Sequence, residues 1–182
     1  SGSPALMNIT CPCCQTGEPI KAGDTEYRCG SCGHAWRTTP PPENYYASCS
    51  GRNAGVNTLN RKHADRMASI APLLRGGMRI LEIGCADGAL GELIKHEADV
   101  HYVGLEISPD AVEADKKLDY VHRRPTSELH TEPFDLLLAF HVLEHIVDIQ
   151  AEATRWRQLL KADGRLIVEV PYRAGHPLLE QD

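Results

Sequence analysis

The sequence predicts an α/β protein with a doubly wound, mostly parallel sheet, preceded by a small cysteine-rich module. From residue 59 onward, short apolar runs typical of buried strands alternate with segments whose apolar residues recur at helical spacing. Near the amino terminus, two C-x-x-C motifs are typical of a metal-bound module. We therefore expect three regions: the cysteine module at 1–39, a proline-rich connector at 40–58 and the sheet domain at 59–182.

Charge and composition narrow the functional classes. The 182 residues carry a formal net charge of -6 with acids and bases interspersed, which disfavours a general nucleic-acid-binding surface. No apolar run approaches the roughly 18 residues of a membrane span, and no charged-then-apolar signal segment is present. Five of the seven cysteines precede residue 33, and their metal-ligand pattern favours a reducing compartment, so we expect a cytoplasmic protein.

The amino-terminal module carries two knuckles, Cys11-Pro12-Cys13-Cys14 and Cys29-Gly30-Ser31-Cys32, separated by 14 residues. This spacing resembles that of a four-cysteine zinc ribbon, in which each tight turn supplies two thiolates. Few large apolar residues lie nearby, so the metal should hold the module together. A structural zinc is expected, with Cys13 or His34 as alternative ligands to the favoured set of Cys11, Cys14, Cys29 and Cys32.

The connector begins at Pro40-Pro41-Pro42, a stiff extended spacer that marks the domain boundary. The following residues 43–57 include Tyr45 and Tyr46, for which we keep two interpretations: a lid over a ligand pocket, or packing between the two modules. Apolar residues then share one face from Leu59 to Arg75, and two glycines follow. This pattern predicts a helix leading into the first strand of the sheet.

The central unit is a strand at Arg79–Ile83, a glycine turn at Gly84–Gly88 and a helix at Ala89–Glu97. Such a turn exposes backbone N–H groups at a helix terminus and lets a ligand approach the backbone. The next strand, His101–Leu105, ends in Glu106. An acidic residue about 20 residues past the glycines is placed to bind a ribose diol. We expect an adenosine-containing ligand, either a nicotinamide dinucleotide or S-adenosylmethionine.

The later segments complete the alternation of helices and strands. We expect a helix at Ser108–Leu118, a short strand at Asp119–His122, a polar loop at Thr126–Pro133 over the adenine edge, a central strand at Phe134–Phe140, a helix at Ile146–Leu160 and a last strand at Leu166–Val170.

Three motifs carry a family resemblance. Glu82–Gly88 resembles the E-x-G-x-G-x-G signature of class I S-adenosylmethionine-dependent methyltransferases, with Ala86 where the middle glycine usually stands. The G-x-G-x-x-G spacing of dinucleotide folds is absent from this turn. Phe134–His145 is similar to the fourth strand and "LEH" segment of the family, and Leu160–Pro171 to its "LKPGG" turn and fifth strand. The resemblance implies a Rossmann-like methyltransferase fold that binds S-adenosylmethionine.

The resemblance also implies roles for residues. Gly84 and Gly88 would border the methionine half of the cofactor, Glu106 would hold the ribose, and Glu82 would orient the turn. His141 would lie beside the sulfonium. The expected cofactor-binding set is Glu82, Gly84, Cys85, Ala86, Gly88, Glu106, Ile107 and His141.

His141 and His145 are the catalytic candidates, and they would share a face if a helix had already begun at His141. One could act as general base, while a structural role remains open for each. The H-E-x-x-H order of a zinc hydrolase is absent, which disfavours a metal pair. Tyr172 and His176 follow the last strand and belong either to the acceptor site or to a solvated loop.

The favoured function is methyl transfer to a small-molecule or sugar-like acceptor, as in bacterial methyltransferases of natural-product, nucleotide-sugar and surface-glycan pathways, which the chain resembles. Two alternatives remain: an inactive methyltransferase-like scaffold that docks a partner through its ribbon, and an RNA or protein methyltransferase. Family members usually continue with an antiparallel strand pair that is expected to be missing here. Either the chain is shortened, or a second subunit or the ribbon covers the last strand.

Overall fold

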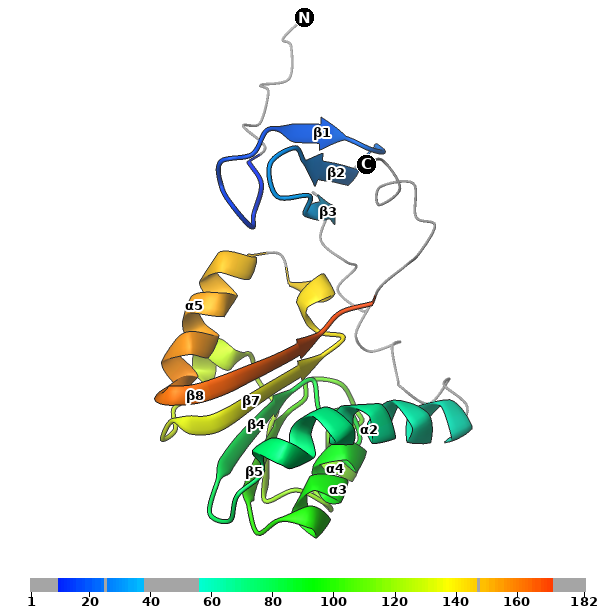
Figure 1. The fold of residues 1–182 in the computed structure, drawn as a ribbon, viewed down its shortest axis with the longest axis vertical. Helices are drawn as coiled ribbons and strands as arrows, with labels where there is room; N and C mark the ends of the chain where they lie inside the picture. Colours follow the sequence, from blue (N-terminus) through cyan, green and yellow to red (C-terminus); the bar gives the residue numbers. More distant parts are fainter. Residues whose placement is uncertain (1–9, 25, 38–55, 147, 172–182) are drawn as a thin grey trace, which may run out of the picture.

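The computed structural model describes residues 10–24, 26–37, 56–146 and 148–171. The tyrosines of the connector and the two residues expected at the acceptor site lie outside these ranges. The amino-terminal module is a small antiparallel sheet in the order β1-β2-β3 (Figure 1). Its strands are β1 (Pro19–Lys21), β2 (Glu26–Cys29) and β3 (Ala35–Arg37).

The second sheet has five strands in the order β6-β5-β4-β7-β8, and every neighbouring pair is parallel. Its strands are β4 (Arg79–Ile83), β5 (His101–Leu105), β6 (Tyr120–His122), β7 (Phe134–Phe140) and β8 (Leu160–Glu169). The strand order reverses between β4 and β7, which is where open α/β sheets bind ligands, at their carboxyl ends. The predicted doubly wound, mostly parallel sheet is confirmed.

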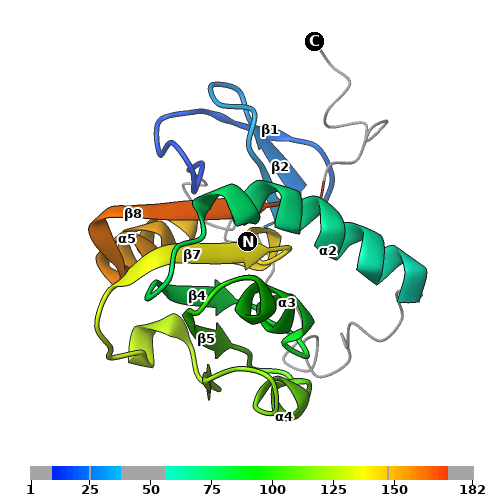
Figure 2. The same cartoon turned by 60° about the horizontal axis from the view of Figure 1, so that its bottom comes forward.

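Helices cover both faces of this sheet (Figures 1 and 2). One face carries α2 (Val56–Ile70), α3 (Ala89–Glu97) and α4 (Ala111–Ala114), and the other carries α5 (Ile149–Leu159). The core therefore has two layers. Ile80 packs with the first group of helices and Leu81 with Trp156 of α5, and both strand residues are fully buried. Burial on both faces explains why β4 is continuously apolar.

Three predicted helices are shorter than expected. The first ends at Ile70 instead of Arg75, because Pro72 has no N–H and the chain tightens into a 3-10 turn at Ala71–Leu73. The helix predicted at Ser108–Leu118 is reduced to α4, and its last residues form turns. There the chain must return to the sheet, since Asp119 N–H donates to the Tyr102 carbonyl at 3.1 Å.

The helix predicted from Ile146 begins at Ile149. Leu143–His145 forms a separate 3-10 turn instead of the start of that helix. The carboxylate of Asp148 accepts the N–H of Ala151 at 3.0 Å, so Asp148 is the N-cap that sets the start of α5.

The last strand begins earlier than predicted, at Leu160. Its pairing with β7 shifts register between Phe134 and Leu136, where the predicted turn residues form a bulge. Lys161 bridges this irregularity through its ammonium group, 2.8 and 2.9 Å from the two carboxylate oxygens of Asp135. Towards the end of the strand and just beyond it, three alternating apolar side chains are exposed: Leu166, Val168 and Val170.

Within the described part of the chain, none of the helices combines the length and the apolarity needed to cross a bilayer.

Candidate functional site

The glycine turn at the end of β4 is a left-handed bend. Gly84, Ala86 and Gly88 have φ angles of 72°, 48° and 76°. The N–H groups of Gly84 and Cys85 both donate to the carbonyl of Leu105, at 2.7 and 3.2 Å, which ties the turn to the end of β5. Ala86 thus has a positive φ, which glycine adopts without strain and alanine at a cost of about 1 kcal/mol.

The two glycines of the turn also allow close packing within the protein. A Cβ at position 84 would lie 2.6 Å from Val142 Cγ2, and one at position 88 would lie 3.0 Å from the Cα of Ala114 in α4. The space that each glycine leaves is therefore taken by neighbouring residues of the chain.

This packing predicts opposite effects for two exchanges in the turn. Ala86→Gly should leave the free energy of unfolding unchanged or raise it by up to about 1 kcal/mol, because a positive φ is unstrained for glycine. Gly88→Ala should lower it by at least about 2 kcal/mol, because strain and overpacking against α4 add together. Urea titration measures both, and a stable Gly88→Ala protein would contradict the packing argument.

Glu106 closes the turn from the neighbouring strand. One carboxylate oxygen accepts the N–H of Ala86 at 2.9 Å, and the other accepts the N–H of Ser108 at 2.7 Å. Each oxygen keeps a further lone pair, so the half-buried carboxylate can still accept hydrogen bonds from a diol. Ile107 beside it is 53% exposed. A fixed carboxylate next to an exposed apolar side chain fits the ribose and adenine of an adenosyl group.

Glu82 and Cys85 direct their side chains into the protein. Glu82 is 4% exposed and accepts the Tyr102 hydroxyl hydrogen at 2.8 Å. Burial raises the pKa of the Glu82 carboxyl to about 7, although the hydrogen bond from Tyr102 acts in the opposite direction. The Cys85 thiol is buried against Gly104, and burial raises its pKa. These two buried side chains therefore pack beneath the turn, inside the protein, and do not face solvent.

The raised pKa of Glu82 predicts a pH-dependent stability. The folded chain binds this proton more tightly than the unfolded chain, whose carboxyl titrates near 4.5. The free energy of unfolding therefore falls as pH rises through the interval from about 5 to 8, by up to about 3 kcal/mol from this group. Glu82→Gln removes the titration and keeps an acceptor for Tyr102. Urea unfolding curves should show the variant gaining stability over the wild type with pH, and a constant difference would refute the assignment.

His141 lies where β7 ends, at the same edge of the sheet. Its φ of 58° is left-handed, and its N–H donates to the Glu169 carbonyl at 2.9 Å. Its Nε2 lies 2.9 Å from Glu169 Oε1, and its Nδ1 lies 3.5 Å from Glu144 Oε1. His141 precedes the 3-10 turn that contains His145, so no helix has begun at His141 and the condition for a shared helix face is not met.

Two residues in this cluster escaped the sequence analysis. Arg66 of α2 donates to both carboxylate oxygens of Glu169, at 2.7 and 3.2 Å. Its guanidinium also lies 4.4 Å from the centre of the Phe140 ring. A charged residue at the end of an apolar strand was the available signal for Glu169. Arg66 lies on a helix 103 residues earlier, with no local pattern that marks it.

Comparisons with known proteins settle the family. Residues 56–181 match the family model described as a methyltransferase domain. The chain belongs to this family. Its methyltransferase domain is similar to the ubiquinone biosynthesis O-methyltransferase of Aromatoleum aromaticum, with 29% identity over 121 residues, 61% of this chain and 49% of the relative. The same enzyme of Cereibacter sphaeroides strain ATCC 17025 is 36% identical over 109 residues, 53% and 42% of the two chains. The chain thus spans about half the length of these relatives, or less.

Solved structures share the fold of the methyltransferase domain. A methyltransferase from Thiobacillus denitrificans in complex with S-adenosyl-L-homocysteine has a TM-score of 0.55 at 15% identity, covering 71% of this chain and 56% of the other. Magnesium protoporphyrin IX methyltransferase from Synechocystis PCC 6803, with bound S-adenosylmethionine, has a TM-score of 0.51 at 19% identity, covering 60% and 57%.

The four predicted zinc ligands of the amino-terminal module come together. The Sγ atoms of Cys11, Cys14, Cys29 and Cys32 all lie within 4.8 Å of one another. The Cys11–Cys32 and Cys14–Cys29 separations are 3.7 and 3.5 Å, close to the roughly 3.8 Å between sulfurs around a tetrahedral zinc. Cys13 lies outside this group, and its carbonyl accepts a hydrogen bond from the Gln150 side chain of α5. Four thiolates fit a zinc ion and leave no open coordination position.

The cysteine cluster predicts a metal requirement for residues 10–37. The purified protein should carry about one zinc per chain by elemental analysis, because four thiolates complete its coordination. Cys29→Ser should weaken zinc binding at least about a hundredfold, and a chelator should make this module sensitive to proteases. Cys13→Ser is the matched control and should keep the metal. If Cys13→Ser lost zinc and Cys29→Ser kept it, the ligand set would have to include Cys13 in place of Cys29.

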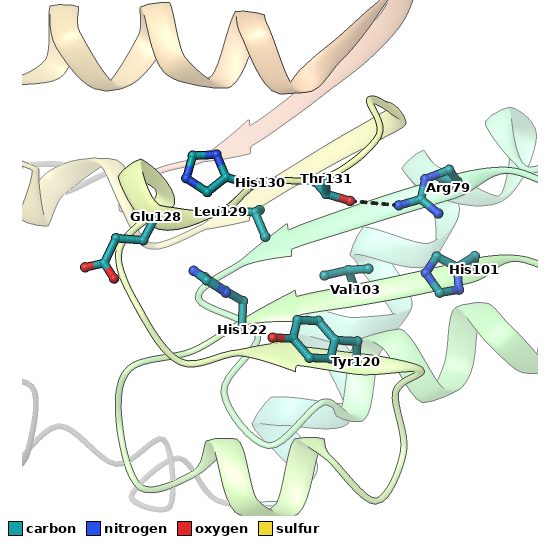
Figure 3. Close-up of a pocket in the computed structure, with 9 residues that line it drawn as sticks. All are labelled: Arg79, His101, Val103, Tyr120, His122, Glu128, Leu129, His130 and Thr131. Atoms are coloured by element: carbon teal, nitrogen blue, oxygen red, sulfur yellow. Dashed lines mark hydrogen bonds between the residues drawn. The ribbon is translucent and has the colours of Figure 1, made fainter.

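A separate cavity of about 320 Å³ lies on the sheet face that carries α5 (Figure 3). It forms beside the loop that joins β6 to β7 in the methyltransferase domain, where Arg79 Nη2 donates to Thr131 Oγ1 at 3.0 Å. None of the predicted site residues lines it. Its lining comprises Arg79, His101, Val103, Tyr120, His122, Glu128, Leu129, His130 and Thr131.

Proposed function

We propose that the protein is an S-adenosylmethionine-dependent methyltransferase that acts on a small-molecule acceptor. The observation that carries this proposal is the Glu106 carboxylate, held by Ala86 and Ser108 across the glycine turn at the carboxyl ends of β4 and β5. The family match and the adenosyl compounds named in the two solved structures support the same ligand class.

Within this proposal, each residue of the edge has a role. Glu106 accepts the ribose hydroxyls, Ile107 packs against the adenine, and the Gly84–Gly88 turn borders the methionine end. His141 lies at the side where the methyl acceptor would enter, since β7 follows β4 at the reversal of strand order. When bound, S-adenosylmethionine supplies an electrophilic methyl group on a sulfonium. The protein must then align an acceptor and exclude water.

Two observations favour a small acceptor over nucleic acid. The formal net charge of -6 opposes binding to a phosphate backbone. The relatives from Aromatoleum aromaticum and Cereibacter sphaeroides are named for O-methylation in ubiquinone biosynthesis, which is small-molecule chemistry. A sugar-like acceptor remains part of the proposed class.

The zinc in this proposal is structural. It links the two knuckles of the amino-terminal module through Cys11, Cys14, Cys29 and Cys32, and it takes no part in methyl transfer. The sulfur separations support this role, because they leave room for one ion with four protein ligands.

Calorimetry with S-adenosyl-L-homocysteine tests the cofactor assignment. The wild type should bind it with a stoichiometry near one per chain. Glu106→Ala should weaken binding by about 10-fold to 100-fold, because hydrogen bonds to a charged group contribute about 1.5 to 3 kcal/mol.

Glu113→Ala is the matched control for this experiment. Glu113 lies on the nearby helix α4 and pairs with Lys116 on the surface at 2.7 Å. Its loss should leave the affinity unchanged. Absence of binding by the wild-type protein would remove the methyltransferase proposal, and equal affinities of the wild type and Glu106→Ala would remove the ribose assignment.

A further inference from the structure

The carboxyl ends of β7 and β8 hold a chain of alternating charges. Arg66 donates to both oxygens of Glu169, and Glu169 Oε1 lies 2.9 Å from His141 Nε2. The Arg66 side chain is 12% exposed and those of Glu169 and His141 are 39% and 33% exposed. The planar guanidinium fixes the carboxylate in two directions, so the imidazole is held in turn.

The backbone holds the imidazole a second time. The His141 N–H donates to the carbonyl of Glu169, the same residue whose side chain faces Nε2. The left-handed φ of His141 is an unfavourable conformation for a side-chain-bearing residue, and such conformations persist where the surroundings enforce them. His141 therefore makes two contacts with Glu169, one through its backbone and one through its side chain, and its backbone is strained. Together these features fix the orientation of the imidazole ring.

The contact with Glu169 distinguishes the two ring nitrogens. Nε2, facing a carboxylate at hydrogen-bond distance, carries the proton of the neutral ring. Nδ1 then keeps its lone pair, and it lies 3.5 Å from Glu144 Oε1, too far for a strong hydrogen bond. The Nδ1 lone pair and the Glu144 carboxylate are both hydrogen-bond acceptors. A hydroxyl group of a bound acceptor could donate its proton to Nδ1.

We propose that Glu169, clamped by Arg66, is a positioning residue that holds His141 with Nδ1 free to take the proton of a phenol-like hydroxyl on the methyl acceptor. This inference rests on the proposed methyltransferase function and narrows its acceptor class. An imidazole is a better base for an acidic hydroxyl than for an alcohol, because the proton is less tightly held by the acidic oxygen.

The acceptor oxygen forms a bond to the methyl carbon while the bond from that carbon to sulfur breaks, and the sulfur keeps the electron pair as a neutral thioether. The hydroxyl proton passes to His141 Nδ1. The positive charge of the sulfonium is thereby replaced by that of the imidazolium, which lies between Glu169 and Glu144.

Other charged groups face this cluster and belong in its pH dependence. Arg66 holds the pKa of the Glu169 carboxyl below its usual range, and the charge of Lys62 on the same helix lowers this pKa further. Glu144 lies on the other side of the ring. Glu169 therefore stays ionised over the neutral and alkaline range, in which a base is needed.

The test uses the full chain, S-adenosylmethionine and catechol as a phenolic acceptor, with rates measured from about pH 6.5 to 10. At neutral pH, Glu169→Gln should lower kcat by about 10-fold to 100-fold, which is part of the roughly 100-fold to 10,000-fold that general-base catalysis contributes. The loss should shrink towards pH 10, because the phenol then ionises without a base. Glu169→Asp should restore part of the rate, and Arg66→Lys should show an intermediate loss.

Calorimetry on the same variants separates this inference from the proposed function. Glu169→Gln should bind S-adenosyl-L-homocysteine as the wild type does, and Glu113→Gln should match the wild type in both assays. An equal loss of rate for Glu169→Gln at every pH would make Glu169 merely structural and overturn the positioning role. Binding of S-adenosyl-L-homocysteine without methylation of catechol at any pH would overturn the phenolic acceptor. Absence of that binding in the wild type would remove the proposed function itself.

Discussion

The hydrogen bond from the Ala86 N–H to the Glu106 carboxylate is the interaction on which the candidate site depends. It joins the turn after β4 to the end of β5, in addition to the hydrogen bonds that the Gly84 and Cys85 N–H groups donate to the Leu105 carbonyl. The same carboxylate is the group that would accept ribose hydroxyls. The shape of the turn and the proposed binding of the ribose therefore depend on the same carboxylate.

The turn and the His141 cluster meet through Val142. Its Cγ2 methyl fills the position that a side chain at Gly84 would occupy, and its neighbour His141 is fixed by Glu169. Movement of the His141 segment would therefore alter the packing under the glycine turn. The two parts of the candidate site, proposed to hold the adenosyl group and the acceptor, share this contact across β4 and β7.

The sheet was predictable because its signals are local. The apolar runs at Arg79–Ile83 and Phe134–Phe140 became β4 and β7 with the predicted bounds, and the four cysteines came together as their spacing indicated. Helix lengths were less predictable, because they depend on where the chain must return to the sheet. The sequence pattern at Ser108–Leu118 would allow a longer helix than α4. The helix is short because the Asp119 N–H donates to the Tyr102 carbonyl, which brings the chain back to the sheet.

Side-chain networks were the least predictable part. The pairing of Arg66 with Glu169 joins residues 103 positions apart, and its geometry depends on how α2 lies across the sheet. Likewise, the glycines were correctly placed in the turn, but the residues that fill the space around them come from α4 and from the segment after β7. Sequence spacing identifies a motif, whereas the neighbours of that motif follow from the packing of the whole domain.

The outer side of β8 has a consequence for the behaviour of the protein in solution. No strand of the described residues pairs with that side, and Leu166 and Val168, two residues apart on one face of the same strand, are exposed apolar groups. Such an edge is a template for contacts between molecules. Arg165 is exposed on the opposite face of this strand. When two such edges approach, their Arg165 side chains repel each other, and salt screens this repulsion. Self-association of concentrated samples should accordingly increase with ionic strength.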